Sequence, residues 1–202
     1  MSSEKTTRRY ELRKRAESME ATRRRITEAA VELHRTVGPA RTTMTAVAQS
    51  AGVQRQPLYR HFADEGELLG ACSGHFAALH PSPDTARWRT IADPAERLRV
   101  GLDELYTWYE ATGTMWARVL RDETLVAAVT TALIPFRAFL DDAAQTLAAG
   151  WGVRGRRREL LLAATRHAVD FHTWESLAGE GGVGRDGVVE LTSAMVGRAV
   201  GE

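Results

Sequence analysis

The sequence has a single cysteine, Cys72, and no run of the roughly 18 apolar residues that a membrane-spanning helix requires. One cysteine excludes an internal disulfide, so the chain does not depend on an oxidising compartment. The N-terminal segment is polar and charged through Glu20, unlike the apolar core of a secretory signal. These absences predict a cytoplasmic protein.

Strand signals are also scarce, because no segment alternates apolar and polar residues between turn clusters. Helical periodicity, in contrast, recurs from Thr22 to the C-terminal end. Apolar residues make up 44% and charged residues 26% of the 202 positions, which is ordinary for a folded globular protein of one or two domains. The sequence therefore predicts an all-α fold of about nine helices.

Start and stop signals divide this helical pattern. A break at residues 80–84 predicts three parts: a basic arm over residues 1–21, a helical domain over 22–79 and a second helical domain over 80–202. Asp93 and Pro94 open a helix that is expected to end near residue 111, before Gly113. Pro135 is expected to kink a later one. The predicted helices cover residues 22–37, 44–51, 55–62, 64–79, 93–111, a region from 114 to 149 divided near 121–124, 156–178 and 188–200.

The net charge of +1 hides an asymmetry along the chain. Residues 1–60 hold 13 basic and 6 acidic residues, a balance of +7, and the remainder has a balance of −6. This distribution favours a polyanion-binding module joined to a body with another task. A solvated charge run is the alternative that charge alone leaves open.

The segment from Thr43 to Phe62 has the pattern of a helix-turn-helix. Thr43 can cap the first short helix, Ala48 is small where two helices approach closely, and Gly52 can adopt the left-handed conformation of a sharp turn. Four apolar residues are spaced to fill a small core beneath the pair: Val47, Val53, Leu58 and Phe62. An ordinary helical hairpin is the alternative, and the joint occurrence of the cap, the alanine and the glycine disfavours it.

These residues resemble the TetR family of bacterial transcriptional regulators. The resemblance covers about residues 22–71, and its most specific residues are Ala51-Gly52-Val53, Leu58-Tyr59-Arg60-His61-Phe62 and Leu68-Leu69. It implies a three-helix N-terminal DNA-binding domain and a C-terminal domain for ligand binding and dimerisation. It also implies a homodimeric repressor that a small-molecule effector releases from a palindromic operator on double-stranded DNA.

The resemblance further implies which residues contact DNA. Gln54, Arg55 and Gln56, at the start of the second helix, would read base edges in the major groove. The remaining candidates would contact phosphates: Thr43, Tyr59, Arg60, His61, Arg23, Arg24 and Arg25.

Two residues depart from the family pattern. Pro57 replaces a small hydroxyl residue, which removes one phosphate contact, and Glu65 stands where a lysine usually faces DNA. We hypothesise that the basic arm compensates for the repulsion by Glu65 by following the DNA backbone or entering the minor groove. Its candidate residues are Arg8, Arg9, Arg13, Lys14 and Arg15, with Arg23, Arg24 and Arg25. A tail without specific contact is the alternative.

The last two predicted helices carry apolar residues around more than one stripe, as a helix packed on two sides requires. In TetR-like proteins such helices form a four-helix bundle between two copies. The alternative is that the same apolar residues form the core of a monomer. The candidate dimerisation residues are Leu161, Leu162, Thr165, Ala168, Val169, His172, Val188, Leu191, Thr192, Met195, Val196 and Ala199.

All five tryptophans follow residue 87. Together with neighbouring aromatic residues they predict a site for a small apolar effector of unidentified chemistry, although each one alone is more simply a core residue. On the long predicted helix, Ala164, His167, Phe171 and Trp174 share a face. The candidate effector-binding residues are Trp108, Tyr109, Met115, Trp116, Phe136, Phe139, His167, Phe171 and Trp174.

Enzymatic chemistry has little support in the sequence. No phosphate loop and no Gly-x-Ser-x-Gly motif is present, and His167 and Asp170 lack the further ligands that a metal site needs. We therefore expect no enzyme, no cofactor and no metal. The second functional class is a DNA-binding protein without an effector, which is either a constitutive regulator or a DNA organiser.

Overall fold

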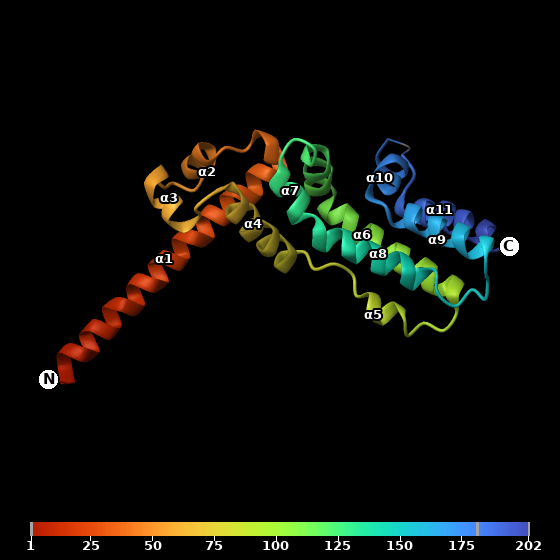
Figure 1. Cartoon of the computed structure of the whole chain (residues 1–202), viewed down its shortest axis with the longest axis horizontal. Coiled ribbons are helices and arrows are strands. Elements are labelled where there is room, and N and C mark those ends of the chain that lie inside the picture. Colours follow the sequence, from red (N-terminus) through yellow and green to blue (C-terminus); the bar gives the residue numbers. More distant parts are fainter. Residues whose placement is uncertain (1, 181, 202) are drawn as a thin grey trace. The chain divides into compact units, whose positions relative to one another are not determined.

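A computed structural model describes residues 2–180 and 182–201, and for residues 2–9 and 180 the backbone alone. Within these residues every regular element is a helix, which confirms the all-α prediction (Figure 1). They form eleven α-helices where about nine were expected, because α5 (Thr85–Trp88) and α10 (Phe171–Trp174) are single turns. None of the described helices is long and apolar enough to span a bilayer.

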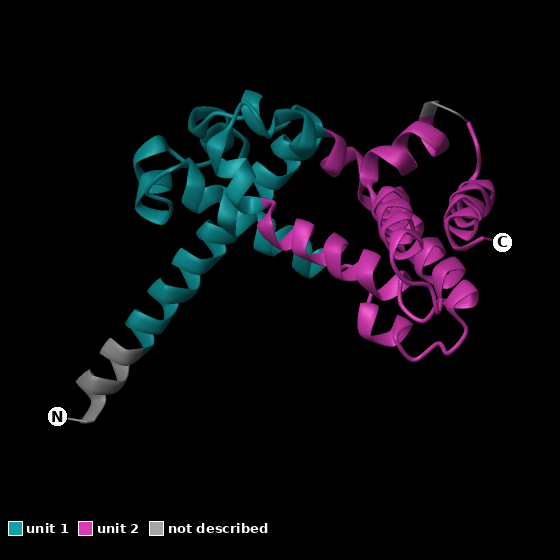
Figure 2. Cartoon of the chain, turned by 45° about the vertical axis from the view of Figure 1, so that its right-hand side comes forward, with its two compact units in different colours: residues 1–79, 118–132 teal, residues 80–117, 133–202 magenta. Residues whose placement is uncertain are grey.

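The helices form two compact units (Figure 2). Unit 1 comprises residues 1–79 and 118–132, and unit 2 comprises residues 80–117 and 133–202. Residues 118–132, which the sequence analysis assigns to the C-terminal domain, therefore belong to unit 1. Helix α6 (Pro94–Asp122) is continuous and contributes residues to both units.

Unit 1 contains a small core under a helix-turn-helix. Its elements are α1 (Ser2–Thr36), a 3₁₀ turn (Pro39–Arg41), α2 (Met44–Ser50), α3 (Arg55–His61), α4 (Glu65–Leu79) and α7 (Ala127–Ala132). Helix α1 packs against α2 and α4. Ile26, Val47, Leu58 and Phe62 are fully buried between them. The boundaries predicted for α2, α3 and α4 agree with the structure to within one residue.

Residues at the end of α6 form hydrogen bonds with the segment that connects α1 to α2. The carboxylate of Asp122, which is only 1% exposed, accepts a hydrogen bond from the Ala40 N–H at 3.0 Å. Arg121 donates through Nε to the same carboxylate at 2.6 Å and through Nη2 to the Val37 carbonyl oxygen at 3.0 Å. These hydrogen bonds fix the position of the segment that precedes α2.

Unit 2 is formed by helices that pack around buried aromatic and aliphatic residues. It contains α5, most of α6, α8 (Ile134–Leu147), α9 (Arg156–Val169), α10, a π-helical turn (Glu175–Glu180) and α11 (Arg185–Val200). Helix α9 packs against α11 and α8. The predicted helix 188–200 begins three residues earlier, at Arg185.

The expected end of α6 near residue 111 is wrong. Gly113 lies inside the helix, and a Cβ at this position would come within 3.0 Å of the Trp174 ring. The glycine therefore permits a close approach of α10 rather than ending α6. Its role depends on a partner that is distant in the sequence.

Two further helix expectations are wrong. Pro135 lies in the first turn of α8, where its missing N–H is tolerated, and so it does not kink a helix. The predicted helix 156–178 is broken at Asp170, whose backbone is extended and whose carboxylate caps α10 by accepting the His172 N–H at 2.9 Å. Asp170 is therefore the N-cap of a new helix, although the helical periodicity of the sequence continues across it.

Two glycine substitutions test the turns on either side of α2. Gly38 and Gly52 have φ values of +93° and +63°. A Cβ at Gly38 would lie 2.3 Å from Asp122 Oδ2, whereas a Cβ at Gly52 would meet nothing within 4 Å. We predict that Gly52→Ala lowers the free energy of unfolding by about 1–2 kcal/mol. Gly38→Ala should lower it by about 3 kcal/mol, because the buried carboxylate must also move. Urea unfolding followed by circular dichroism measures both values, and equal decreases would contradict the role given to Asp122.

Candidate nucleic-acid interface

The turn between α2 and α3 forms as the sequence predicts. Thr43 Oγ1 accepts a hydrogen bond from the Ala46 N–H at 3.1 Å and so caps α2. Gly52 adopts its positive φ directly after α2, and the Val53 N–H bonds back to the Ala48 carbonyl oxygen at 3.0 Å. The chain therefore reverses within a few residues and enters α3 at Arg55.

Helix α3 presents a polar face to solvent. Leu58 and Phe62 are fully buried, which fixes the rotation of the helix about its axis. Tyr59 is 44% exposed, His61 and Pro57 are half-buried, and the remaining candidates are exposed: Gln54, Arg55, Gln56 and Arg60. The predicted base-reading and phosphate-contacting residues of this helix thus share one accessible surface, as an element that enters a DNA groove requires.

Arg23 of α1 contacts residues at both ends of the α3–α4 connection. Its Nη1 donates to the His61 carbonyl oxygen and lies 3.5 Å from Glu67 Oε1, and its guanidinium carbon is 4.2 Å from the centre of the Phe62 ring. Arg23 therefore has partners inside unit 1, whereas Arg24 and Arg25 are exposed. This geometry supports a role for Arg23 in positioning α3.

Glu67 was not among the residues predicted from the sequence, although a signal for it was present. Asp64 Oδ1 accepts the Glu67 N–H at 2.8 Å, and Glu67 Oε2 accepts the Ala63 N–H at 2.9 Å. An Asp followed three residues later by Glu is the pattern of such a reciprocal helix cap. The cap fixes the start of α4 next to the end of α3.

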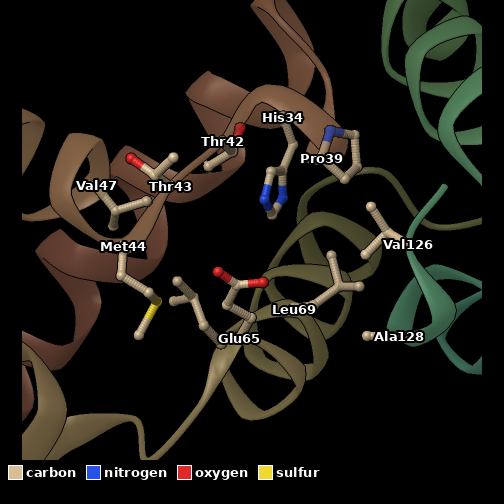
Figure 3. Close-up of a pocket in the computed structure, with 11 residues that line it drawn as sticks. His34, Pro39, Thr42, Thr43, Met44, Val47, Glu65, Leu69, Val126 and Ala128 are labelled. Atoms are coloured by element: carbon tan, nitrogen blue, oxygen red, sulfur yellow. The ribbon is translucent and has the colours of Figure 1, made fainter.

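Glu65 points toward the imidazole of His34 across a pocket in unit 1 (Figure 3). The pocket is mostly apolar and is lined by His34, Pro39, Thr42, Thr43, Met44, Val47, Glu65, Leu68, Leu69, Val126 and Ala128. Burial lowers the pKa of His34 to about 4, so its ring is neutral near pH 7. The nearby Arg121 guanidinium holds the pKa of the Asp122 carboxyl below its usual value.

Seven of the nine candidate effector residues form a connected aromatic cluster in unit 2. The Trp108 ring lies 5.5–6.2 Å from the rings of Tyr109, Trp116, Phe136 and Phe139. Tyr109 in turn contacts Phe171 at 5.3 Å and Trp174 at 5.6 Å. The Trp174 Nε1 donor is buried without a partner among the described residues, so the cluster holds an unused hydrogen-bond donor.

The two other candidates lie differently. His167 is exposed and its Nδ1 lies 3.2 Å from Thr173 Oγ1, because the break at Asp170 separates it from the face expected to carry Phe171 and Trp174. Met115 is buried on α6. In the cluster itself, burial raises the pKa of Tyr109, whose hydroxyl donates to the Val169 carbonyl oxygen at 2.8 Å.

Most of the candidate dimerisation residues fill the interior of unit 2. Seven are buried within this single chain: Leu161, Thr165, Ala168, Val169, Val188, Thr192 and Val196. Leu162, Met195 and Ala199 are half-buried, and His172 and Leu191 are exposed. Tyr106 joins α6 to this interior by donating to the Ala168 carbonyl oxygen at 2.7 Å.

The described residues contain no group of three His, Cys, Asp or Glu side chains that could hold a metal ion.

Comparison with known families identifies the helix-turn-helix region. Residues 26–72 match the family model described as bacterial regulatory proteins, tetR family. The matched residues span the end of α1 through α4, which includes α3 and its exposed face. A search of curated proteins gives no match.

Several solved structures share the fold of nearly the whole chain. NalD, the secondary repressor of the MexAB-OprM multidrug efflux pump of Pseudomonas aeruginosa, is 21% identical, with a TM-score of 0.57 over 91% of this chain and 97% of NalD. A protein from Saccharomonospora viridis described as a transcriptional regulator, solved in complex with choline, is 19% identical, with a TM-score of 0.61 over 88% and 96%. A TetR-like transcriptional regulator from Rhodococcus sp. RHA1 is 17% identical, with a TM-score of 0.58 over 90% and 97%.

Proposed function

We propose that this chain is a DNA-binding transcriptional regulator of the TetR family, and that it acts as a dimeric repressor that a small-molecule effector releases from a palindromic operator. The observation that carries the proposal is the exposed polar face of α3, which the burial of Leu58 and Phe62 fixes in place. In a helix-turn-helix, the second helix enters the major groove with such a face toward the base edges.

The residues of this face have distinct tasks. Arg55 is suited to guanine and Gln54 and Gln56 to adenine, each through two hydrogen bonds. Tyr59, Arg60 and His61 position the helix on phosphates. Thr43 can join them, because its oxygen accepts the Ala46 N–H while its hydroxyl proton remains free to be donated.

A dimer interface on α9 and α11 must use residues that the chain does not bury by itself. Leu160 and Leu191 are 44% and 51% exposed, and Leu162, Met195 and Ala199 are half-buried beside the internal core. These residues, rather than the seven buried ones, are the contact surface that we propose for the second copy.

The aromatic cluster of unit 2 is the effector site that we propose. Large rings and the unpaired Trp174 donor suit a small organic molecule that carries a hydrogen-bond acceptor. The complex of the Saccharomonospora viridis protein with choline makes choline a suitable first probe, because aromatic rings bind quaternary ammonium groups. A ligand lowers DNA affinity by no more than its differential affinity for the two conformations.

Two alternatives remain distinguishable from this proposal. A constitutive DNA-binding protein would hold its operator in the presence of every compound tested. A non-specific DNA organiser would show no sequence preference in competition binding. Catalysis has no support in the arrangement of the described side chains, and a DNA target fits the cytoplasmic location that the sequence predicts.

Substitution of Arg55 and Arg60 tests the assignment of α3. Arg55→Ala should cost about 1–3 kcal/mol of operator binding and abolish the preference for one base pair. Arg60→Ala should weaken binding to all sequences alike and lower the salt dependence by about one unit for each phosphate that the protein no longer neutralises. Fluorescence anisotropy with the operator and single-base variants measures both effects. Retention of every base preference by Arg55→Ala would contradict the assignment.

Leu191→Arg tests the proposed dimer surface. A charge at the centre of an apolar contact should cost about 2 kcal/mol, which is about 30-fold in the dimer Kd. Leu125→Arg is the matched control, since Leu125 is 71% exposed in unit 1 and lies outside the proposed surface. Sedimentation equilibrium compares the two variants, and a wild-type dimer Kd for Leu191→Arg would exclude this surface.

Trp116→Leu tests the effector site. The Trp116 ring stacks on Phe136 at 4.0 Å, whereas Trp151 makes no ring contact with the other described residues and donates to the Leu147 carbonyl oxygen. We expect Trp116→Leu to bind the operator normally and to lose release by the effector, and Trp151→Leu to keep both. Gel shifts over a panel of small molecules that includes choline measure release. Unchanged release of Trp116→Leu would place the effector elsewhere.

A further inference from the structure

The segment Tyr10–Ala21 of α1 projects from unit 1 without packing against it. Every residue from Tyr10 to Ala21 is exposed, although the helix continues unbroken into the buried residues Ile26 and Ala30 (Figure 1). Residues 10–25 are called the helical arm below. A helix this long without tertiary contacts gains little stability from the fold itself.

The charge of this segment is strongly positive. Residues 10–25 hold six basic and three acidic residues, a balance of +3, and residues 2–9 add three basic residues and one acidic residue. Arg13 is paired with Glu17 at 2.8 Å. In the described part of the chain, Lys14, Arg15 and Arg24 form no ion pair, so these cations face solvent.

The base of the arm is anchored beside the end of α3. Arg23 donates to the carbonyl oxygen of His61, the last residue of α3, and lies over the ring of Phe62. At a rise of about 1.5 Å per residue, the arm is about 24 Å long. An arm anchored there can reach phosphates beyond the base pairs that α3 contacts, since successive phosphates of one strand are about 3.4 Å apart along the axis.

We propose that the helical arm binds the phosphates of duplex DNA that flanks each half-site. Charge complementarity and continuity with α3 favour DNA as the occupant of this surface. The arm is helical, and a helix about 10–12 Å wide does not enter a minor groove about 6 Å wide. It therefore contacts the backbone without reading sequence. This inference rests on the proposed function and extends its DNA contact beyond the helix-turn-helix.

A second copy of the arm is the other candidate occupant. Leu12, Ala16 and Met19 form a short apolar stripe in register with the core residues Ile26 and Ala30. The stripe contains one alanine and spans only two helical turns, and two arms of charge +3 repel each other. Pairing of arms is therefore an outcome of the test rather than the proposal.

The test combines arm variants with operators of different length. The full chain carries either Lys14→Gln with Arg15→Gln, or, as a matched control of opposite sign, Glu11→Gln with Glu20→Gln. Each protein is titrated with an operator trimmed to its two half-sites and with one extended by about ten random base pairs on each side. Affinities are measured over a series of salt concentrations.

We expect wild-type protein to bind the extended operator more tightly, whatever the flanking sequence. The Lys14/Arg15 variant should lose this preference. Its salt dependence should fall by about one unit for each phosphate that the arm no longer neutralises, two to four units for a dimer. The Glu11/Glu20 variant should strengthen the preference. Wild-type salt dependence and flank preference in the Lys14/Arg15 variant would overturn the proposal.

Two further outcomes are separate from these. If Leu12→Ser with Met19→Ser changes the oligomeric state and the charge variants change nothing, the arm pairs with another copy and the proposal is wrong. If the wild-type protein fails to recognise even the trimmed operator, the proposed function fails first. Specific binding of the trimmed operator with no effect of flanks or arm charge rejects the arm alone.

Discussion

The burial of Leu58 and Phe62 fixes the surface that α3 presents to solvent. Helix α3 has seven residues, too few for a stable helix in water, so its structure and rotation come from the core that it covers. Ile26 and Val47 supply the other side of that core. Because these apolar contacts fix which face of α3 is inside, they also fix which polar side chains are outside.

Polar contacts hold this small core at both of its ends. Arg23 and Glu67 join α1 to the α3–α4 connection, and Asp122 and Arg121 join the end of α6 to the α1–α2 connection. A buried carboxylate is tolerated only with such partners, and removing one of them leaves a costly unpaired charge. Helix α6 carries Trp108 and Trp116 of the aromatic cluster and ends at Asp122, so one continuous element contains both the proposed effector contacts and the bond to Ala40.

Local signals predicted α2, α3 and α4 well, but they placed the start of α1 at residue 22 instead of Ser2. The failures elsewhere have physical causes. The Thr43 cap, the Gly52 turn and the spacing of Leu58 and Phe62 act over a few residues, so the sequence alone places α2 and α3. Gly113 was misread because its lack of a side chain serves the distant Trp174 ring, an approach that no local pattern encodes.

The same limit applies to the candidate sites of unit 2. Asp170 breaks a continuous helical pattern and leaves His167 outside the aromatic cluster. Periodicity selected Leu161, Ala168 and other apolar residues of α9 and α11, but it cannot separate residues buried inside one chain from residues that contact a second copy. The exposed fractions of Leu160 and Leu191 leave these two side chains available to the second copy that we propose. Arg23 shows a related limit, since a basic residue near a DNA-binding motif can serve the fold.

Selection of binding sites from random-sequence duplex DNA with the purified wild-type chain tests the central claim most directly. If two copies present the exposed face of α3 to successive major grooves, the recovered sequences form an inverted repeat. Its half-site centres should lie about 10–10.5 base pairs, or a multiple of that, apart. Recovery of no common sequence, or of a single element without a symmetric mate, would contradict the account.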